Sequence, residues 1–110
     1  MSKTANKMDR ARFDMLRRIG CIACRKDGHR NDQIDVHHLT EGGRRLGHQQ
    51  TIPLCPWHHR GVIPFLPYPV EQKYLHLTAP SLAVSRRDFE AKYGTQRELL
   101  DEVNKLLEAV

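Results

Sequence analysis

The sequence lacks any apolar run long enough to cross a membrane, and its first residues, MSKTANKMDRAR, lack the apolar centre of a secretory signal. It has only three cysteines, an odd number, two of them close together in CIAC. We therefore expect a protein of the reducing cytoplasm, where clustered cysteines bind metal more often than they form disulfides. No repeat, low-complexity tract or linker divides the chain, so we expect a single domain spanning residues 1–110.

Acidic residues are in the minority. Thirteen Asp and Glu stand against 18 Lys and Arg, which gives a formal net charge of +5. This excess suits a polyanionic partner, although charge by itself indicates association and not chemistry. A chain of 110 residues also has a small hydrophobic core, so we expect an additional staple to stabilise the fold.

The N-terminal segment predicts a helix. Apolar residues recur at helical spacing between Met8 and Ile19, and Gly20 follows the last of them. We therefore expect a helix within residues 1–20 that packs its apolar face against the core.

The C-terminal residues 85–110 predict further helices. Ser85 with Asp88, and Thr95 with Glu98, resemble capping boxes that begin a helix. The last segment then carries one apolar stripe, which is typical of an amphipathic helix packed against the core.

A proline-rich segment separates the middle of the chain from these helices. Four prolines between Pro64 and Pro80 exclude a long regular helix, so we expect an ordered loop or lid over residues 63–84. His76 in this segment and His29 before the first strand are isolated, and we expect them to be ordinary surface or capping residues.

Residues 21–62 carry two metal-ligand patterns. Cys21 and Cys24 form a C-x-x-C knuckle, and about thirty residues later Cys55 and His58 form a C-x-x-H knuckle. Together they predict a closed Cys3His site for a structural Zn²⁺, because four protein ligands leave no position for a substrate. A C-x-x-C redox pair is the alternative, but no strand-helix-strand pattern surrounds it and a matching knuckle is present.

His59 directly follows the second knuckle and needs a different site. Neighbouring residues of a helix point about 100° apart, so His58 and His59 cannot both face the same zinc ion. The stretch IDVHHL predicts a short strand that ends in His37 and His38, TIPLC predicts a return strand, and PWHHRG predicts a helix. We therefore expect strand, loop, strand and helix, with both strand histidines facing His59 across a shallow cleft.

Several motifs resemble one family of nucleases. CIAC, VHHLTEGGRR, GHQQTIPLCPWHHRG and FEAKYG followed by a Leu-rich helix look like the phage recombination-enhancement nucleases called Ref, within the HNH or ββα-metal family. The similarity covers nearly the whole chain after the N-terminal helix. It implies an α+β fold with a small zinc-stapled ββα-metal core, an N-terminal helix and C-terminal helices. It also implies DNA cleavage where a RecA filament has formed.

The resemblance also implies roles for individual residues. His37 and His59 match the ligands of a catalytic Mg²⁺ or another divalent cation, and His38 matches the general base that activates water. Where the family pattern has Asn, nine residues before His59, this chain has Gln50. Gln50, or His48 two residues earlier, is therefore expected to orient the base.

Three arginines are candidates for DNA binding. Arg44 and Arg45, on the loop at the rim of the predicted cleft, and Arg60, after the second knuckle, could hold phosphates, although a solvated loop is the alternative for the first two. His48 fits a plain loop histidine equally well. Trp57 lies between the knuckle residues and is expected in the core.

Together with these patterns, the resemblance implies a metal-dependent HNH DNA endonuclease, dependent on a RecA filament and linked to phage recombination in the cytoplasm of a bacterial host. Two alternatives stay open. One is a non-catalytic zinc-containing nucleic-acid-binding module, and the other is a protein whose knuckles and terminal helices recognise another protein. The histidines left after a complete zinc set, two of them adjacent at a strand end, favour the enzyme.

Overall fold

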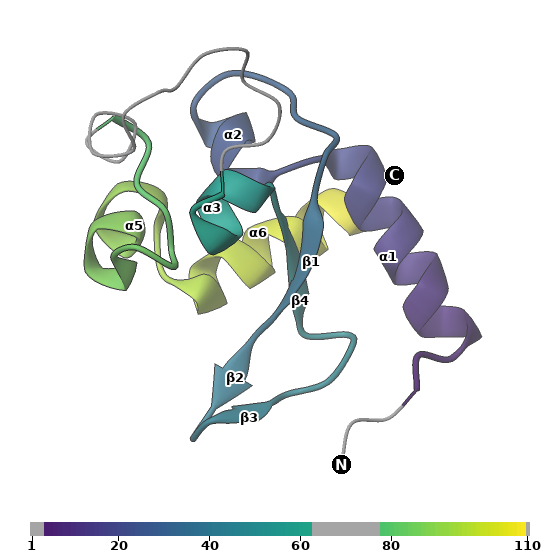
Figure 1. Cartoon of the computed structure of the whole chain (residues 1–110). Helices are drawn as coiled ribbons and strands as arrows, with labels where there is room; N and C mark the ends of the chain where they lie inside the picture. The colour runs from purple at the N-terminus through teal and green to yellow at the C-terminus, as the bar shows by residue number, and fades with distance from the viewer. Residues whose placement is uncertain (1–3, 63–77, 110) are drawn as a thin grey trace.

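Two antiparallel strands, β1 (Asp35–His38) and β4 (Thr51–Leu54), pair at the centre of the structure (Figure 1). The computed structural model describes residues 4–62 and 78–109. Every residue of β4 is buried, whereas β1 is half-buried along its length. Helices surround this pair, so the predicted α+β class is confirmed.

The N-terminal helix α1 (Lys7–Ile19) confirms the first helical prediction and begins at a full capping box. The side chain of Asn6 accepts the backbone N–H of Asp9 at 2.8 Å, and the Asp9 carboxylate accepts the N–H of Asn6 at 3.1 Å. The helix ends at Gly20. Figure 1 shows α1 along one side of the strand pair.

The predicted C-terminal helices are α5 (Arg86–Tyr93) and α6 (Gln96–Glu108). Each begins where its cap was expected, because the side chains of Ser85 and Thr95 accept the backbone N–H three residues ahead. Helix α6 lies behind the strands and α5 lies beyond α3, on the side of the strand pair opposite α1 (Figure 1).

The core fills the space between β4 and the helices. It contains apolar residues from α1, β4, α3, α5 and α6, namely Leu16, Ile19, Ile52, Leu54, Trp57, Phe89, Tyr93, Leu99, Leu100 and Val103. Trp57 is only 6% exposed and donates its indole N–H to the carbonyl of Ala79, so its predicted core position is confirmed. Among the described residues, no helix combines the length and apolar character needed to cross a bilayer.

A small hairpin and two short helices complete the middle of the chain. Strands β2 (Thr40–Glu41) and β3 (Arg44–Arg45) pair through a Gly42–Gly43 turn, where φ angles of 60° and 78° suit glycine. Helix α3 (Pro56–Arg60) was predicted, whereas α2 (Ile22–Lys26) was not. Of the predicted proline-rich loop, residues 63–77, including His76, lie outside the described residues.

Candidate metal centre and histidine pairs

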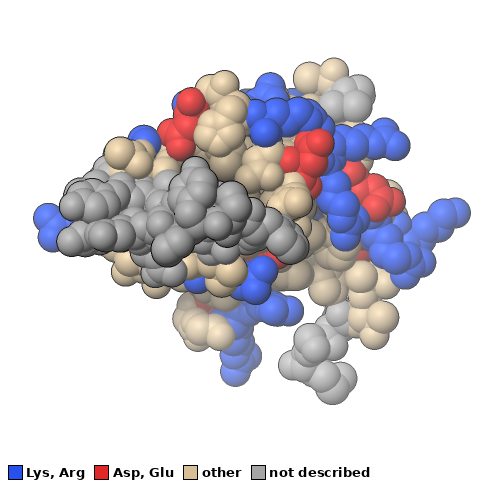
Figure 2. Space-filling view, turned by 45° about the horizontal axis from the view of Figure 1, so that its top comes forward, with Lys and Arg blue, Asp and Glu red and all other residues tan. Residues whose placement is uncertain are grey.

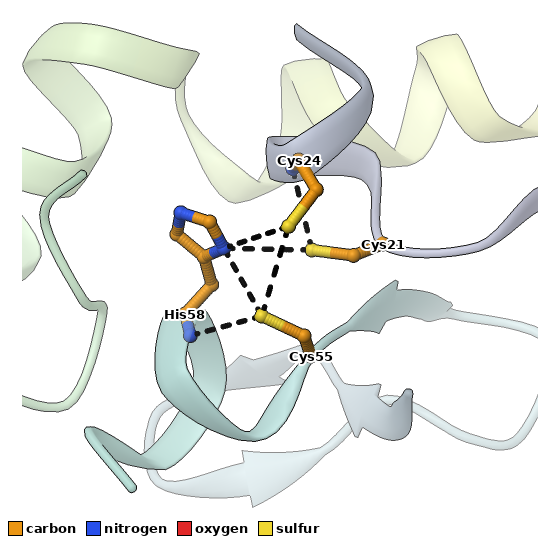
Figure 3. Close-up of side chains that lie close together, drawn as sticks. All are labelled: Cys21, Cys24, Cys55 and His58. Carbon is orange, nitrogen blue, oxygen red and sulfur yellow. Dashed lines mark hydrogen bonds between the residues drawn. The ribbon is translucent and has the colours of Figure 1, made fainter. Parts of the chain in front are cut away.

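The two knuckles have the same local structure. Cys21 precedes α2 and its Sγ accepts the backbone N–H of Cys24, while Cys55 precedes α3 and its Sγ accepts the backbone N–H of His58, both at 3.4 Å. Each cysteine therefore caps a short helix whose first turn carries the second ligand. Figure 3 shows the four side chains converging from these two helices.

The geometry of the cluster fits a tetrahedral metal ion. Nδ1 of His58 lies 3.6, 3.5 and 3.2 Å from the Sγ atoms of Cys21, Cys24 and Cys55, and the last two sulfurs are 3.8 Å apart. Zinc bonds of about 2.3 Å to sulfur and 2.0 Å to nitrogen would separate tetrahedral ligands by roughly 3.5–3.8 Å. All four residues are buried, so this group could hold a metal such as zinc.

The electrostatics of the sulfurs point to a cation. Hydrogen bonds with Cys24 and with Cys55, together with burial, raise the pKa of the Cys21 thiol well above its ordinary value. A thiolate at Cys21 is therefore unfavourable unless a positive charge neutralises it, whereas hydrogen bonds from Cys21 and Cys24 lower the pKa of Cys55. A bound divalent metal supplies that charge and converts the crowded thiols into ligands.

A hydrogen-bond chain sets the tautomer of His58. The hydroxyl of Tyr93 donates to Oδ2 of Asp27 at 2.7 Å, so it can accept the N–H of His58 Nε2, which lies 3.0 Å away. Burial, and then the hydrogen bond to Asp27, raise the pKa of Tyr93 and keep this hydroxyl protonated. With hydrogen on Nε2, the lone pair of His58 is on Nδ1, which is the atom that faces the three sulfurs.

The substitution Tyr93→Phe should weaken zinc binding without unfolding the protein. The phenyl ring keeps the packing against His58. The Nε2–H of His58, however, loses the hydroxyl acceptor that orients this metal ligand. We expect zinc affinity to fall about tenfold, the lower end of the range for such outer contacts. Competition with a chromophoric chelator measures this. The control is Asp32→Ala, which changes an exposed carboxylate paired with Arg30. If Tyr93→Phe bound zinc as tightly as the native chain, Tyr93 would not have the role of orienting His58.

A second group joins His37 and His59. Their ring centroids are 4.9 Å apart, and the two come from β1 and α3 as the sequence predicted. Nε2 of His37 lies 2.7 Å from Oε1 of Gln96, and Nδ1 of His59 lies 2.9 Å from Oδ2 of Asp35. Both oxygen atoms can only accept, so each imidazole carries hydrogen on the nitrogen that is engaged.

These tautomers leave a lone pair on Nδ1 of His37 and on Nε2 of His59. Burial lowers the pKa of His37, against the opposing hydrogen bond to Gln96, so its ring is neutral near pH 7. Burial raises the pKa of Asp35, but hydrogen bonds from His59 and Arg60 outweigh it and keep the carboxylate ionised. Two imidazoles held by outer acceptors, each with a lone pair on its other nitrogen, are suited to an open metal site that has room for other ligands.

His38 lies with a different partner, so the prediction that both strand histidines face His59 is met by His37 and not by His38. Adjacent residues of a strand project to opposite faces, and the contacts agree, because His37 meets His59 while Nε2 of His38 lies 2.9 Å from Nδ1 of His48. The rings of His38 and His48 also pack edge-on against Phe13 of α1. Burial, followed by the charge of Arg45, lowers the pKa of His38, so this imidazole is neutral near pH 7 and able to accept a proton.

The remaining predicted site residues lie around these pairs. Arg44 and Arg45 are exposed on β3, and the charge of Arg45 acts on both His37 and His38. The main-chain carbonyl of Gln50 accepts the backbone N–H of Leu39 at 2.9 Å.

Arg60 forms an ion pair with the carboxylate of Asp35, with Nε and Oδ2 2.7 Å apart. That carboxylate thus contacts both Arg60 and the neighbouring His59.

Three contacting residues were missed from the sequence. Asp35 lies two residues before His37 on the same strand, so the period of two could have placed it on the same face. Gln96 and Tyr93 approach their histidines from 59 and 35 residues away, and no local pattern marks them.

The chain was also compared with known families. A family model described as "Recombination enhancement, RecA-dependent nuclease" matches residues 3–108. The match includes both knuckles, both histidine pairs and the terminal helices.

Proposed function

Because the chain belongs to the family of recombination-enhancement, RecA-dependent nucleases, we propose that it is an HNH-type endonuclease that hydrolyses DNA phosphodiesters with a divalent metal. The observation that carries the metal-dependent part is the His37–His59 pair, in which an outer acceptor holds each ring and the ring centroids lie 4.9 Å apart. The pair offers two ligands, which leaves room for water and a phosphate oxygen.

His37 and His59 would hold Mg²⁺ or another divalent cation. When bound there, such a cation neutralises charge on the scissile phosphate and on the departing 3′ oxygen. Asp35 and Gln96 keep the two ligand rings in the required tautomers through their hydrogen bonds.

His38 is the proposed general base. Its neutral imidazole removes a proton from the attacking water, and the resulting cleavage leaves a 5′ phosphate and a 3′ hydroxyl. His48 supports the ring of His38 at 2.9 Å, so the contacts favour His48 over Gln50 as the residue that orients the base.

Arginines would hold the DNA backbone beside these histidines. Arg45 lies close enough to lower the pKa of both His37 and His38, which is the position expected of a phosphate-binding side chain. Arg44, on the same strand as Arg45, would contact a flanking phosphate. Arg60 would contact another phosphate in addition to its partner Asp35. In Figure 2, Lys and Arg outnumber Asp and Glu on the visible surface, in keeping with the net charge of +5.

The Cys3His group would hold a structural zinc ion. Four buried protein ligands complete its coordination, so it has no position for a phosphate or an attacking water. The zinc would join α2 to α3, and through Tyr93 to α5, which supplies the staple that a small core requires.

RecA dependence is tested by nicking assays at fixed salt. A net charge of +5 gives sequence-indifferent attraction to DNA but no means of choosing a target, so we expect weak or no cutting of naked duplex. Adding RecA, a nucleotide and a divalent metal should stimulate cutting strongly, as in the cytoplasm of a bacterial host where RecA filaments form.

His38→Ala is the blank for this assay. Equal cutting of bare DNA with and without RecA would reduce the proposal to a non-specific HNH nuclease. Metal binding without any cutting would instead favour a nucleic-acid-binding module that contains zinc.

A further inference from the structure

A pocket of about 430 Å³ opens beside His38 and His48. Its walls are the start of α1 and residues 45–50, which lead from β3 to β4. Figure 1 shows this connection lying between the strand pair and the N-terminal end of α1. Neither His37 nor His59 is among the described residues that line the pocket, so it is separate from the proposed metal ligands.

The pocket presents hydrogen-bond acceptors. Asp9 is only 8% exposed, and its carboxylate accepts the side-chain N–H of Gln49 at 2.8 Å and the backbone N–H of Asn6 at 3.1 Å. Because a carboxylate accepts only, Gln49 must turn its NH₂ group to Asp9. The carbonyl oxygen of Gln49 and the remaining lone pairs of Asp9 are then what the two side chains can offer to a ligand.

The other walls suit a nucleotide. Arg45 contributes a positive charge at the side of the pocket shared with His38, where a phosphate would lie, and Leu46 with Gly47 contributes an apolar surface. A volume of about 430 Å³ lies near the lower end of the roughly 300–1,000 Å³ range of small-ligand sites. That is enough for one nucleotide and too small for a stretch of duplex.

We propose that this pocket receives one unpaired nucleotide of the cleaved strand, next to the scissile phosphate, and prefers adenine, cytosine or guanine over thymine. Those three bases carry an exocyclic amino group whose two N–H groups can donate to Asp9 and Gln49 together, whereas thymine offers only its single N3–H. In a duplex each amino group gives one N–H to its pairing partner, so an extruded or single-stranded nucleotide, with both N–H groups available, fits the pocket better. The proposal rests on the proposed nuclease function.

A binding measurement tests the pocket without relying on catalysis. The zinc-loaded full chain is titrated with each of the four deoxynucleoside monophosphates while amide NMR signals are recorded. We expect dAMP, dCMP and dGMP to shift the signals of the Gln49 side chain and of Gly47, and dTMP to bind about fivefold more weakly, the factor for one net hydrogen bond. Inorganic phosphate alone should leave these signals in place.

Two variants sharpen the comparison. Gln49→Ala should remove the difference between dTMP and the other nucleotides, whereas Gln33→Ala, on an exposed glutamine outside the pocket, should keep it. Equal binding of all four nucleotides by the native chain, or shifts confined to residues outside the pocket, would overturn the proposal.

Mapping of cut positions on RecA-bound DNA tests whether the ligand is the cleaved strand. Thymine should be depleted about fivefold at one position beside the cut, and Gln49→Ala should even out the bases at that position, whereas Gln33→Ala should keep the depletion. Nucleotide binding without this base preference at the cut would refute the claim that the pocket's ligand is the cleaved strand. Cutting without nucleotide binding would refute the binding role of the pocket but leave the proposed nuclease function standing. Nucleotide binding without any cutting would refute the nuclease function and, with it, the assignment of the cleaved strand as the ligand.

Discussion

Cys55→Ala is expected to lose the zinc ion and, with it, the folded state. Cys55 supplies one of four buried ligand atoms and also caps α3, the helix that carries the fourth ligand, His58. Structural zinc sites contribute about 10–16 kcal/mol of apparent binding free energy, which matches or exceeds the roughly 5–15 kcal/mol that stabilises a typical domain. Elemental analysis should find about one zinc per native chain and far less in the variant, and circular dichroism should show the loss of helix.

Two histidine variants provide the matched comparison. His58→Ala should behave like Cys55→Ala, because it removes another ligand, whereas His29→Ala changes an exposed histidine and should leave zinc content and melting unchanged. A zinc-free native chain that melts at the same temperature as the zinc-loaded chain would contradict the structural role of the metal.

His38→Ala should leave the fold and the zinc content intact while removing most of the cutting. The side chain is half-buried beside His48 and Phe13 and contributes no atom to the Cys3His group. A general base typically contributes about 10²- to 10⁴-fold to a rate, so single-turnover cleavage on RecA-bound DNA should slow by this factor. Melting curves and zinc analysis of the same sample separate lost chemistry from lost structure.

His59→Ala separates the base from the metal ligands. It should slow cutting as His38→Ala does, and in addition weaken binding of the catalytic divalent cation, which calorimetric titration of the zinc-loaded chain measures. Cutting by His38→Ala at the native rate would remove the base assignment. If His58→Ala stayed folded and zinc-loaded while His59→Ala unfolded, the roles assigned to these neighbouring histidines would be reversed.

Local patterns in the sequence predicted most elements of this fold, but not α2 or the hairpin of β2 and β3. The C-x-x-C and C-x-x-H spacings place their ligands within single helical turns, and the capping residues mark where α5 and α6 begin. The knuckles could be paired because one closed site requires four ligands. The motifs around the histidines predicted the nuclease family to which the chain belongs, since catalytic motifs retain residue types at short, defined spacings.

The predictions for individual site residues depended on more than spacing. Both His48 and Gln50 fitted the position of the missing Asn, and their separation of two residues could not decide between them. In the structure the β3–β4 connection brings the ring of His48 against His38, and Phe13 of α1 packs against both rings.

The sequence by itself determined the two knuckles, the helix caps, the strand that carries His37 and the family, because each depends on residues close together in the chain. Only the tertiary structure decided which acceptors set the histidine tautomers and where a pocket opens. Gln96 reaches His37, Tyr93 reaches His58, and Gln49 reaches Asp9 across 59, 35 and 40 residues. Such contacts follow from the packing of whole elements around a shared core, and no short-range pattern records that packing.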